Sequence, residues 1–160
     1  MAVRRLVAVA LAIAVVSVGL VAATSSERVL VVEDADTGER LLTVPVHEGS
    51  TVTLAYTHSV EKTPVEDVYT VNGTGLDNTL MRFESYGWGL PARENVTLRD
   101  GWFVFDPDRS YDELYVKPGR VADHTLRVDG RAYDLVELSN ASSVRITVTR
   151  RTAISRLFRQ

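Results

Sequence analysis

The stretch TVTLAYTHSV, residues 51–60, decides the fold class because its apolar and polar side chains alternate one by one. The even positions hold valine, leucine, tyrosine and histidine, whereas the odd positions hold mainly threonine and small side chains. This period of two is typical of a β-strand that buries one face. We therefore expect a strand over 51–60 that turns His58 toward the apolar side and Ser59 toward the polar side.

Similar short runs continue through residues 27–149, and no window long enough for a core helix shows the 3.6-residue period. The Asp-Gly dipeptides at 100–101 and 129–130 suit two-residue hairpin turns. The predicted fold is all-β, an antiparallel sandwich or small barrel of about ten short strands. The other expected strands are at 29–32, 41–44, 65–71, 79–85, 95–99, 102–105, 114–116, 124–128, 131–136 and 144–148.

Length and composition limit the protein to one domain plus an export or anchor segment. The chain has 160 residues, no cysteine and a net charge of -3, so disulfides, thiolate metal sites and a cysteine nucleophile are excluded. All 21 acidic residues lie between residues 24 and 149, together with 12 basic ones. No overall positive field therefore indicates a nucleic-acid partner.

The N-terminal segment predicts contact with a membrane. Residues 6–23 are uncharged and almost wholly apolar, and as a helix they would measure about 27 Å, close to the thickness of a bilayer core. Arg4 and Arg5 precede them, which places the N-terminus in the cytoplasm and the domain outside. A cleaved signal peptide is the alternative, because Val-Ala-Ala at 21–23 suits a cleavage site. Either way residues 1–26 form the export segment and 27–149 the exported domain.

Two further surface features accompany this prediction. Residues 150–160 form a basic tail, either a short interfacial helix or a solvated end. Three asparagines begin glycosylation sequons and are candidates for modification in an exported protein, although such residues also cluster in turns. The three asparagines are Asn72, Asn95 and Asn140.

Two polar segments interrupt the strand pattern and form the candidate functional corner. One follows the strand at 51–60. The other is a glycine loop that exposes the Trp88 indole, and this indole is either a platform for a ligand or a plug for one end of the fold. The candidate residues are His58, Ser59, Glu61, Lys62, Glu66, Gly87, Trp88, Gly89 and Pro91. A third segment of interest is Asp-Gly-Trp at 100–102.

The spacing of the histidine, serine and acidic residues gives little support for a catalytic or metal site. A metal site could combine His58 and His124 with Glu66 or Asp123, but no short-range ligand spacing accompanies them. A triad of Ser59, His124 and Asp123 is disfavoured, because a nucleophilic serine is usually displayed on a strained turn. Residues 34–39 resemble a calcium loop only faintly, and a hairpin turn is preferred there. We predict no catalytic residue, no metal and no cofactor.

The motifs together resemble the domain-of-unknown-function 1850 family of bacteria and halophilic archaea. They are Thr-His-Ser-Val-Glu-Lys at 57–62, Glu66, Gly-x-Gly-Leu-Pro at 87–91 and Asp-Gly-Trp at 100–102. The resemblance spans roughly residues 46–138. It carries over His58, Ser59, Glu66, Gly87 and Gly89, whereas His124 and Trp88 lie outside the shared pattern. Members of this family are often encoded beside the membrane subunits of TRAP transporters of the TAXI type, so the resemblance implies such a partner.

The sequence therefore predicts a membrane-anchored, extracytoplasmic β-domain without catalytic activity. The expected role is an accessory of a TRAP-type uptake system that contacts the permease or its solute-binding protein. One alternative is a small-molecule or metal-binding, hydrolase-like domain that uses His58, Ser59 and Glu66. Another is a structural domain of the cell surface. Convergence of those three side chains around an open cavity would favour the hydrolase-like alternative.

Overall fold

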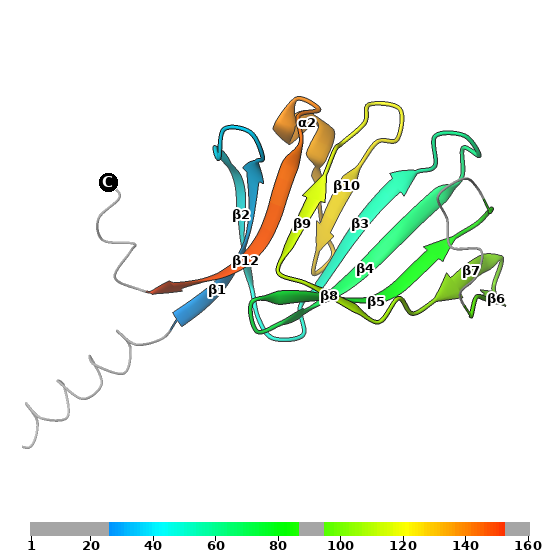
Figure 1. Cartoon of the computed structure of the whole chain (residues 1–160), viewed down its shortest axis with the longest axis horizontal. Helices are drawn as coiled ribbons and strands as arrows, with labels where there is room; N and C mark the ends of the chain where they lie inside the picture. Colours follow the sequence, from blue (N-terminus) through cyan, green and yellow to red (C-terminus); the bar gives the residue numbers. More distant parts are fainter. Residues whose placement is uncertain (1–25, 87–94, 153–160) are drawn as a thin grey trace, which may run out of the picture. The chain divides into compact units, whose positions relative to one another are not determined.

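The computed structural model describes residues 26–86 and 95–152, and these residues are predominantly β-structure (Figure 1). The contacts divide the chain into two compact units, one of which is residues 28–149. The apolar segment 6–23 lies outside the described residues, as do Gly87, Trp88, Gly89 and Pro91. Within the described part, no helix is both long enough and apolar enough to cross a membrane.

The smaller sheet has four strands in the order β2-β1-β12-β9. Its members are β1 (Ser26–Asp34), β2 (Arg40–Val46), β9 (Glu113–Val116) and β12 (Val144–Thr152). The turn between β1 and β2 forms because the Asp34 side chain accepts hydrogen bonds from the backbone N–H groups of Asp36 and Thr37, at 3.0 and 2.8 Å. The segment 34–39 is therefore the expected hairpin turn.

Within residues 26–86 and 95–152 the larger sheet has eight strands, with seven in the order β11-β10-β3-β4-β5-β7-β6 and β8 paired with β5. All its pairings are antiparallel. Its members are β3 (Thr51–Thr57), β4 (Pro64–Asn72), β5 (Gly75–Phe83), β6 (Thr97–Arg99), β7 (Trp102–Phe105), β8 (Arg109–Tyr111), β10 (Thr125–Val128) and β11 (Arg131–Asp134). Both predicted Asp-Gly turns are present, with positive φ at each residue of 100–101 and 129–130.

The two sheets contribute side chains to one main hydrophobic core. Leu30 of β1 and Ile146 of β12 are fully buried, as is Leu76 of β5, and Leu126 of β10 is 1% exposed. In β10 and β12 the inward residues alternate with more exposed ones, as the period of two predicts, whereas residues 29–32 of β1 are all buried. The antiparallel all-β prediction is confirmed. The barrel alternative is wrong, because both sheets are open and keep edge strands.

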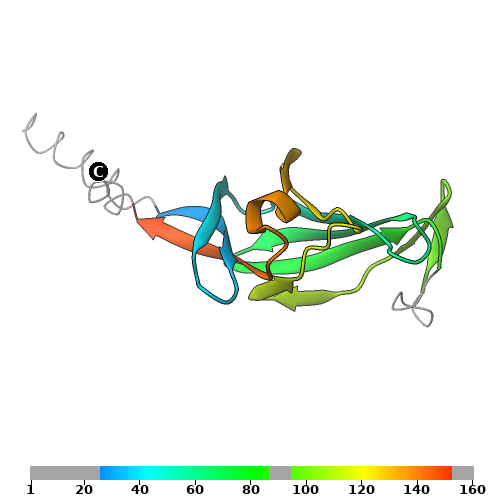
Figure 2. The ribbon, with the colours of Figure 1, turned by 90° about the horizontal axis from the view of Figure 1, so that it is seen from above.

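A second, smaller core lies on the part of the large sheet that extends past the small one (Figures 1 and 2). Its buried members are Val65, Phe83 and Phe105. Phe83 contacts Tyr86 and Phe103, with ring centroids 5.1 and 5.6 Å away. Tyr56 packs against both cores and so lies where they meet.

Two local predictions are wrong. The strand predicted over 51–60 ends at Thr57, so His58 and Ser59 lie in a turn rather than on opposite faces of a strand. The strand predicted over 131–136 ends at Asp134, and a helix, α2 (Leu135–Ser139), follows. The Asp134 side chain caps this helix by accepting a hydrogen bond from the Glu137 N–H at 2.9 Å.

Candidate functional site

The first half of the candidate corner is a braced turn between β3 and β4. The His58 N–H donates to the Thr63 carbonyl at 2.8 Å, and the Lys62 N–H donates to the His58 carbonyl at 2.9 Å. The Glu61 N–H donates to Nδ1 of His58 at 3.3 Å. Lys62 adopts a positive φ of 58°, which lets the chain reverse. These contacts tie the half-buried His58 to the backbone of its own turn.

The turn is also joined to the loop that precedes β10. The Thr57 N–H donates to the Ala122 carbonyl at 2.7 Å. Val60 in the turn is 65% exposed and Val121 in the loop is 68% exposed. Because β3 and β10 are antiparallel neighbours, both valines lie at the same end of the large sheet. We call residues 58–63 and 117–124 the paired loops.

Glu66 lies apart from the turn, on the outer face of the large sheet. Its carboxylate accepts hydrogen bonds from Nε of Arg82 at 2.7 Å and from Nη1 of Arg127 at 2.9 Å. Arg82 in turn covers the Trp102 ring, 4.8 Å from its centroid. Partial burial opposes ionisation of Glu66, but the hydrogen bonds from the two arginines outweigh it and hold its pKa below the usual value. Glu66 is therefore ionised at neutral pH. We call Arg82, Glu66 and Arg127 the ion row.

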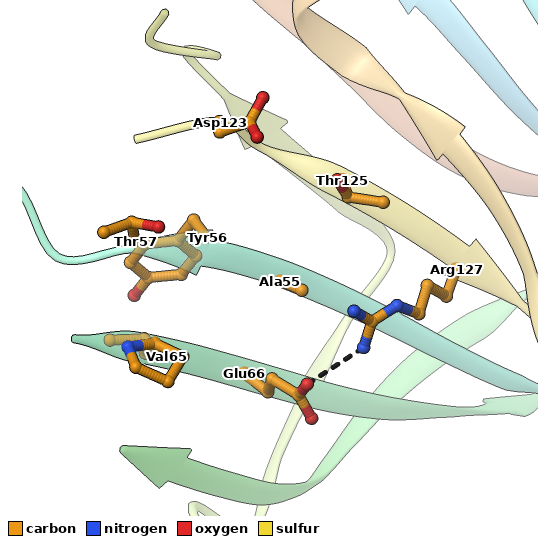
Figure 3. A pocket seen from close by; sticks show the side chains of 9 residues that line it. Ala55, Tyr56, Thr57, Val65, Glu66, Asp123, Thr125 and Arg127 are labelled. Atoms are coloured by element: carbon orange, nitrogen blue, oxygen red, sulfur yellow. Dashed lines mark hydrogen bonds and ion pairs between the residues drawn. The ribbon is translucent and has the colours of Figure 1, made fainter. Parts of the chain in front are cut away.

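A hollow of about 210 Å³ opens beside this row, over strand β3 (Figure 3). Ala55 supplies a small side chain at its floor, and Arg127 reaches from β10 across β3 to Glu66 on β4. We call this cavity the β3 hollow. Its lining residues are Ala55, Tyr56, Thr57, Pro64, Val65, Glu66, Asp123, Thr125 and Arg127.

The opposite, inward face of the same strands carries a half-buried acid, Asp67, that was not among the predicted site residues. Asp67 on β4 is bonded to the Tyr56 hydroxyl and has the Asn78 side chain within hydrogen-bond reach. Burial raises the pKa of Asp67 to about 6. The sequence contained a signal, because Asp67 has the same parity as the apolar Val65 and Tyr69 in the alternating run 65–71.

His124 is a packing residue beside this acid. Its ring stacks on Tyr56, with centroids 5.1 Å apart and planes 11° from parallel, and its Nδ1 accepts a hydrogen bond from the Gly119 N–H at 3.2 Å. Burial lowers the pKa of His124, which favours the neutral imidazole. An Nδ1 that accepts from a backbone N–H fixes the proton on Nε2 in that neutral form.

The candidate residues do not gather into one site. Glu66 lines the β3 hollow, whereas His58 and Ser59 do not, and Ser59 is exposed in the turn together with Glu61 and Lys62. Among the described residues, no group of three or more His, Cys, Asp or Glu side chains could hold a metal ion. The convergence of His58, Ser59 and Glu66 that would favour a hydrolase-like domain is not formed around this hollow.

All three sequon asparagines are exposed. Asn72 ends β4 and donates to Asp77 at 2.9 Å, and Asn95 follows the undescribed segment 87–94. Asn140 caps the C-terminus of α2 with a positive φ of 49°, and its Oδ1 accepts a hydrogen bond from Arg120 at 2.8 Å. These positions leave all three side chains at the surface.

In its described residues, the molecule is an antiparallel β-domain that displays paired loops at one sheet end and an ion row with a small hollow on one face. Residues 52–135 match the family model described as Domain of unknown function (DUF1850), which covers more than half of the chain. The chain belongs to this family, and the predicted resemblance is confirmed. No curated protein and no solved structure matches it.

Proposed function

We propose that the protein is a membrane-anchored, extracytoplasmic β-domain that serves a TRAP-type uptake system as a non-catalytic accessory. Residues 6–23 would hold it in the cell membrane as a single-pass anchor, or direct its secretion if they are cleaved. The paired loops would contact the permease or its solute-binding protein. The choice of partner is supported by the resemblance to a family whose members are often encoded beside TRAP transporter subunits. The choice of contact surface is supported by the structure of the paired loops.

The observation that carries this proposal is the construction of the paired loops. The backbone bond from Thr57 to Ala122 ties two loops that are far apart in sequence, so their relative position is fixed before a partner arrives. Each loop presents one exposed valine, and Glu61 and Lys62 add charges beside Val60. A preorganised surface with apolar side chains among charges is typical of a protein contact.

The chemistry of the described side chains supports binding over catalysis. His58 is engaged by its own turn, His124 stacks on Tyr56, and Glu66 is shared by two arginines. None of these groups has the partner arrangement of a nucleophile and a general base. The alternative hydrolase-like function lacks such a constellation among the described residues.

A deletion strain tests the proposal. Removal of the gene should reduce TRAP-dependent uptake of organic acids by the cell, and the wild-type gene should restore it. The double variant Val60→Asp, Val121→Asp should fail to restore uptake while reaching the membrane in normal amounts, because charges would oppose burial in a contact. The matched control is Tyr115→Asp, on an equally exposed residue of the small sheet. Normal uptake in the deletion strain would refute the proposal.

A further inference from the structure

The β3 hollow carries unlike charges at its two ends. The Arg127 guanidinium bonds to Glu66 and closes one end, and Asp123 stands beyond Thr125 at the other (Figure 3). Thr125 contributes a hydroxyl group between them, Thr57 lies at the Asp123 end, and Ala55 leaves room over the middle of β3. The cavity therefore offers a cationic end, a polar middle and an anionic end.

The cationic end has a surplus of positive charge. Arg82 and Arg127 share the single carboxylate of Glu66, so this row carries two positive charges and one negative charge. Arg82 is also engaged by the Trp102 ring, whereas Arg127 lines the hollow. A guanidinium offers a planar fork of donors, for which a carboxylate is the matching ligand group. A second carboxylate at Arg127 would complete an alternating row of charges.

The anionic end selects against a second negative group on the ligand. Asp123 is exposed and held by its loop, with its N–H donating to the Gly119 carbonyl at 2.9 Å and a φ of 53°. An ammonium group near this carboxylate would be attracted, and a carboxylate would be repelled. The volume of about 210 Å³ suits a small molecule of a few heavy atoms.

We infer that the β3 hollow binds a small amino carboxylate, with its carboxylate at Arg127 and its ammonium group toward Asp123. This site goes beyond the proposed accessory role. It needs no transporter subunit, so a binding experiment on the purified chain can fail while the accessory role stands. Equally, the hollow can bind its ligand while the accessory role fails.

Isothermal titration of the full chain in detergent micelles tests the inference with three compounds of similar size. 4-Aminobutanoate carries both charges, butanoate only the negative one, and succinate two negative ones. We expect 4-aminobutanoate to bind most tightly of the three. The affinity for succinate should be lower by about tenfold or more, because Asp123 repels the second carboxylate. Equal or tighter binding of succinate, or no binding of 4-aminobutanoate at millimolar concentration, would overturn the inference.

Two variants assign the ends of the ligand. Arg127→Gln should weaken binding of 4-aminobutanoate by about tenfold or more, and Arg127→Lys should weaken it less because the charge remains. Asp123→Asn should remove most of the preference for 4-aminobutanoate over succinate. An asparagine tolerates the positive φ of this position, so the loop should keep its shape.

The matched controls lie elsewhere on the same domain. Arg131→Gln removes an exposed arginine of β11, and Asp108→Asn removes an exposed aspartate with a similar φ of 46°. Neither residue lines the hollow, so both variants should bind as the wild type does. Thermal unfolding confirms that each variant is folded before titration. Unchanged selectivity in Asp123→Asn, or equal losses in the controls, would overturn the inference.

Discussion

Replacing the half-buried acid Asp67 by asparagine should stabilise the protein at neutral and alkaline pH. The wild-type carboxyl lies inward on β4, in contact with the Tyr56 hydroxyl and close to Asn78. At high pH it must be ionised in a poorly hydrated place, which costs free energy. Asparagine has nearly the same shape, can accept the tyrosine hydrogen bond and carries no charge.

The size of the effect follows from the pKa of Asp67, which rises from 3.8 to about 6 in the folded protein. The folded state therefore holds this proton more tightly than the unfolded state. A difference of about two pKa units corresponds to about 3 kcal/mol of stability. This contribution is fully present below about pH 4 and is lost as the pH rises through about 6. The asparagine variant keeps an uncharged group at every pH.

The assay is urea unfolding of the full chain in detergent micelles, followed by tryptophan fluorescence at several pH values. The measured quantity is the difference in unfolding free energy between Asp67→Asn and wild type, which cancels the titration of other groups. It should grow by about 3 kcal/mol in favour of the variant between pH 4 and pH 8.

The control Asp77→Asn should change in the opposite direction. Hydrogen bonds from Ser110 and Asn72 lower the pKa of Asp77, so its ionised form stabilises the fold. The asparagine variant of this residue should therefore lose stability relative to wild type as the pH rises. A free-energy difference for Asp67→Asn that does not vary with pH, or that favours wild type at pH 8, would show that the ionised carboxyl of Asp67 does not destabilise the fold.

Three further predictions concern the core, the helix cap and the ion row. Phe83→Ala should lower the free energy of unfolding by about 3 to 5 kcal/mol in urea denaturation, because Phe83 is fully buried. In the same assay the control Leu98→Ala, at a position 66% exposed, should change the free energy of unfolding by less than about 0.5 kcal/mol. Asp134→Ala should cost about 1 kcal/mol through loss of the α2 cap, and a thermal midpoint equal to that of wild type would contradict this. Glu66→Gln should cost about 1 to 3 kcal/mol at pH 7, and because the pKa of Glu66 is lowered, the loss should shrink in unfolding titrations below about pH 4.

The strands and hairpins could be predicted because their causes are local. Alternation along 51–57 and 65–71 marks one buried face, and Asp-Gly at 100–101 and 129–130 supplies the positive φ values of tight turns. The end of β3 could not be predicted in this way. The alternation of apolar and polar residues continues through His58 and Val60. The backbone after Thr57, however, no longer pairs with a neighbouring strand, because His58 forms hydrogen bonds within the turn.

The short helix and the site depend on information that periodicity lacks. Helix α2 has only five residues, too few to show a helical period, although Asp134 followed by Glu137 has the spacing of a capping box. The link from Glu66 to Arg127 crosses β3, so it depends on the strand order and the register. Asp67 could have been found, since an acid at an inward position of a strand requires a buried partner.

The proposed accessory role requires that the paired loops contact a transporter component outside the cytoplasmic membrane. A photo-crosslinking amino acid at Val60, 65% exposed in the turn, tests it most directly in native membranes. We expect a covalent adduct with the TRAP permease or its solute-binding protein. The same amino acid at Tyr115, 66% exposed on the small sheet, should give none. No transporter adduct from Val60, or equal adducts from both positions, would show that the paired loops are not the contact surface.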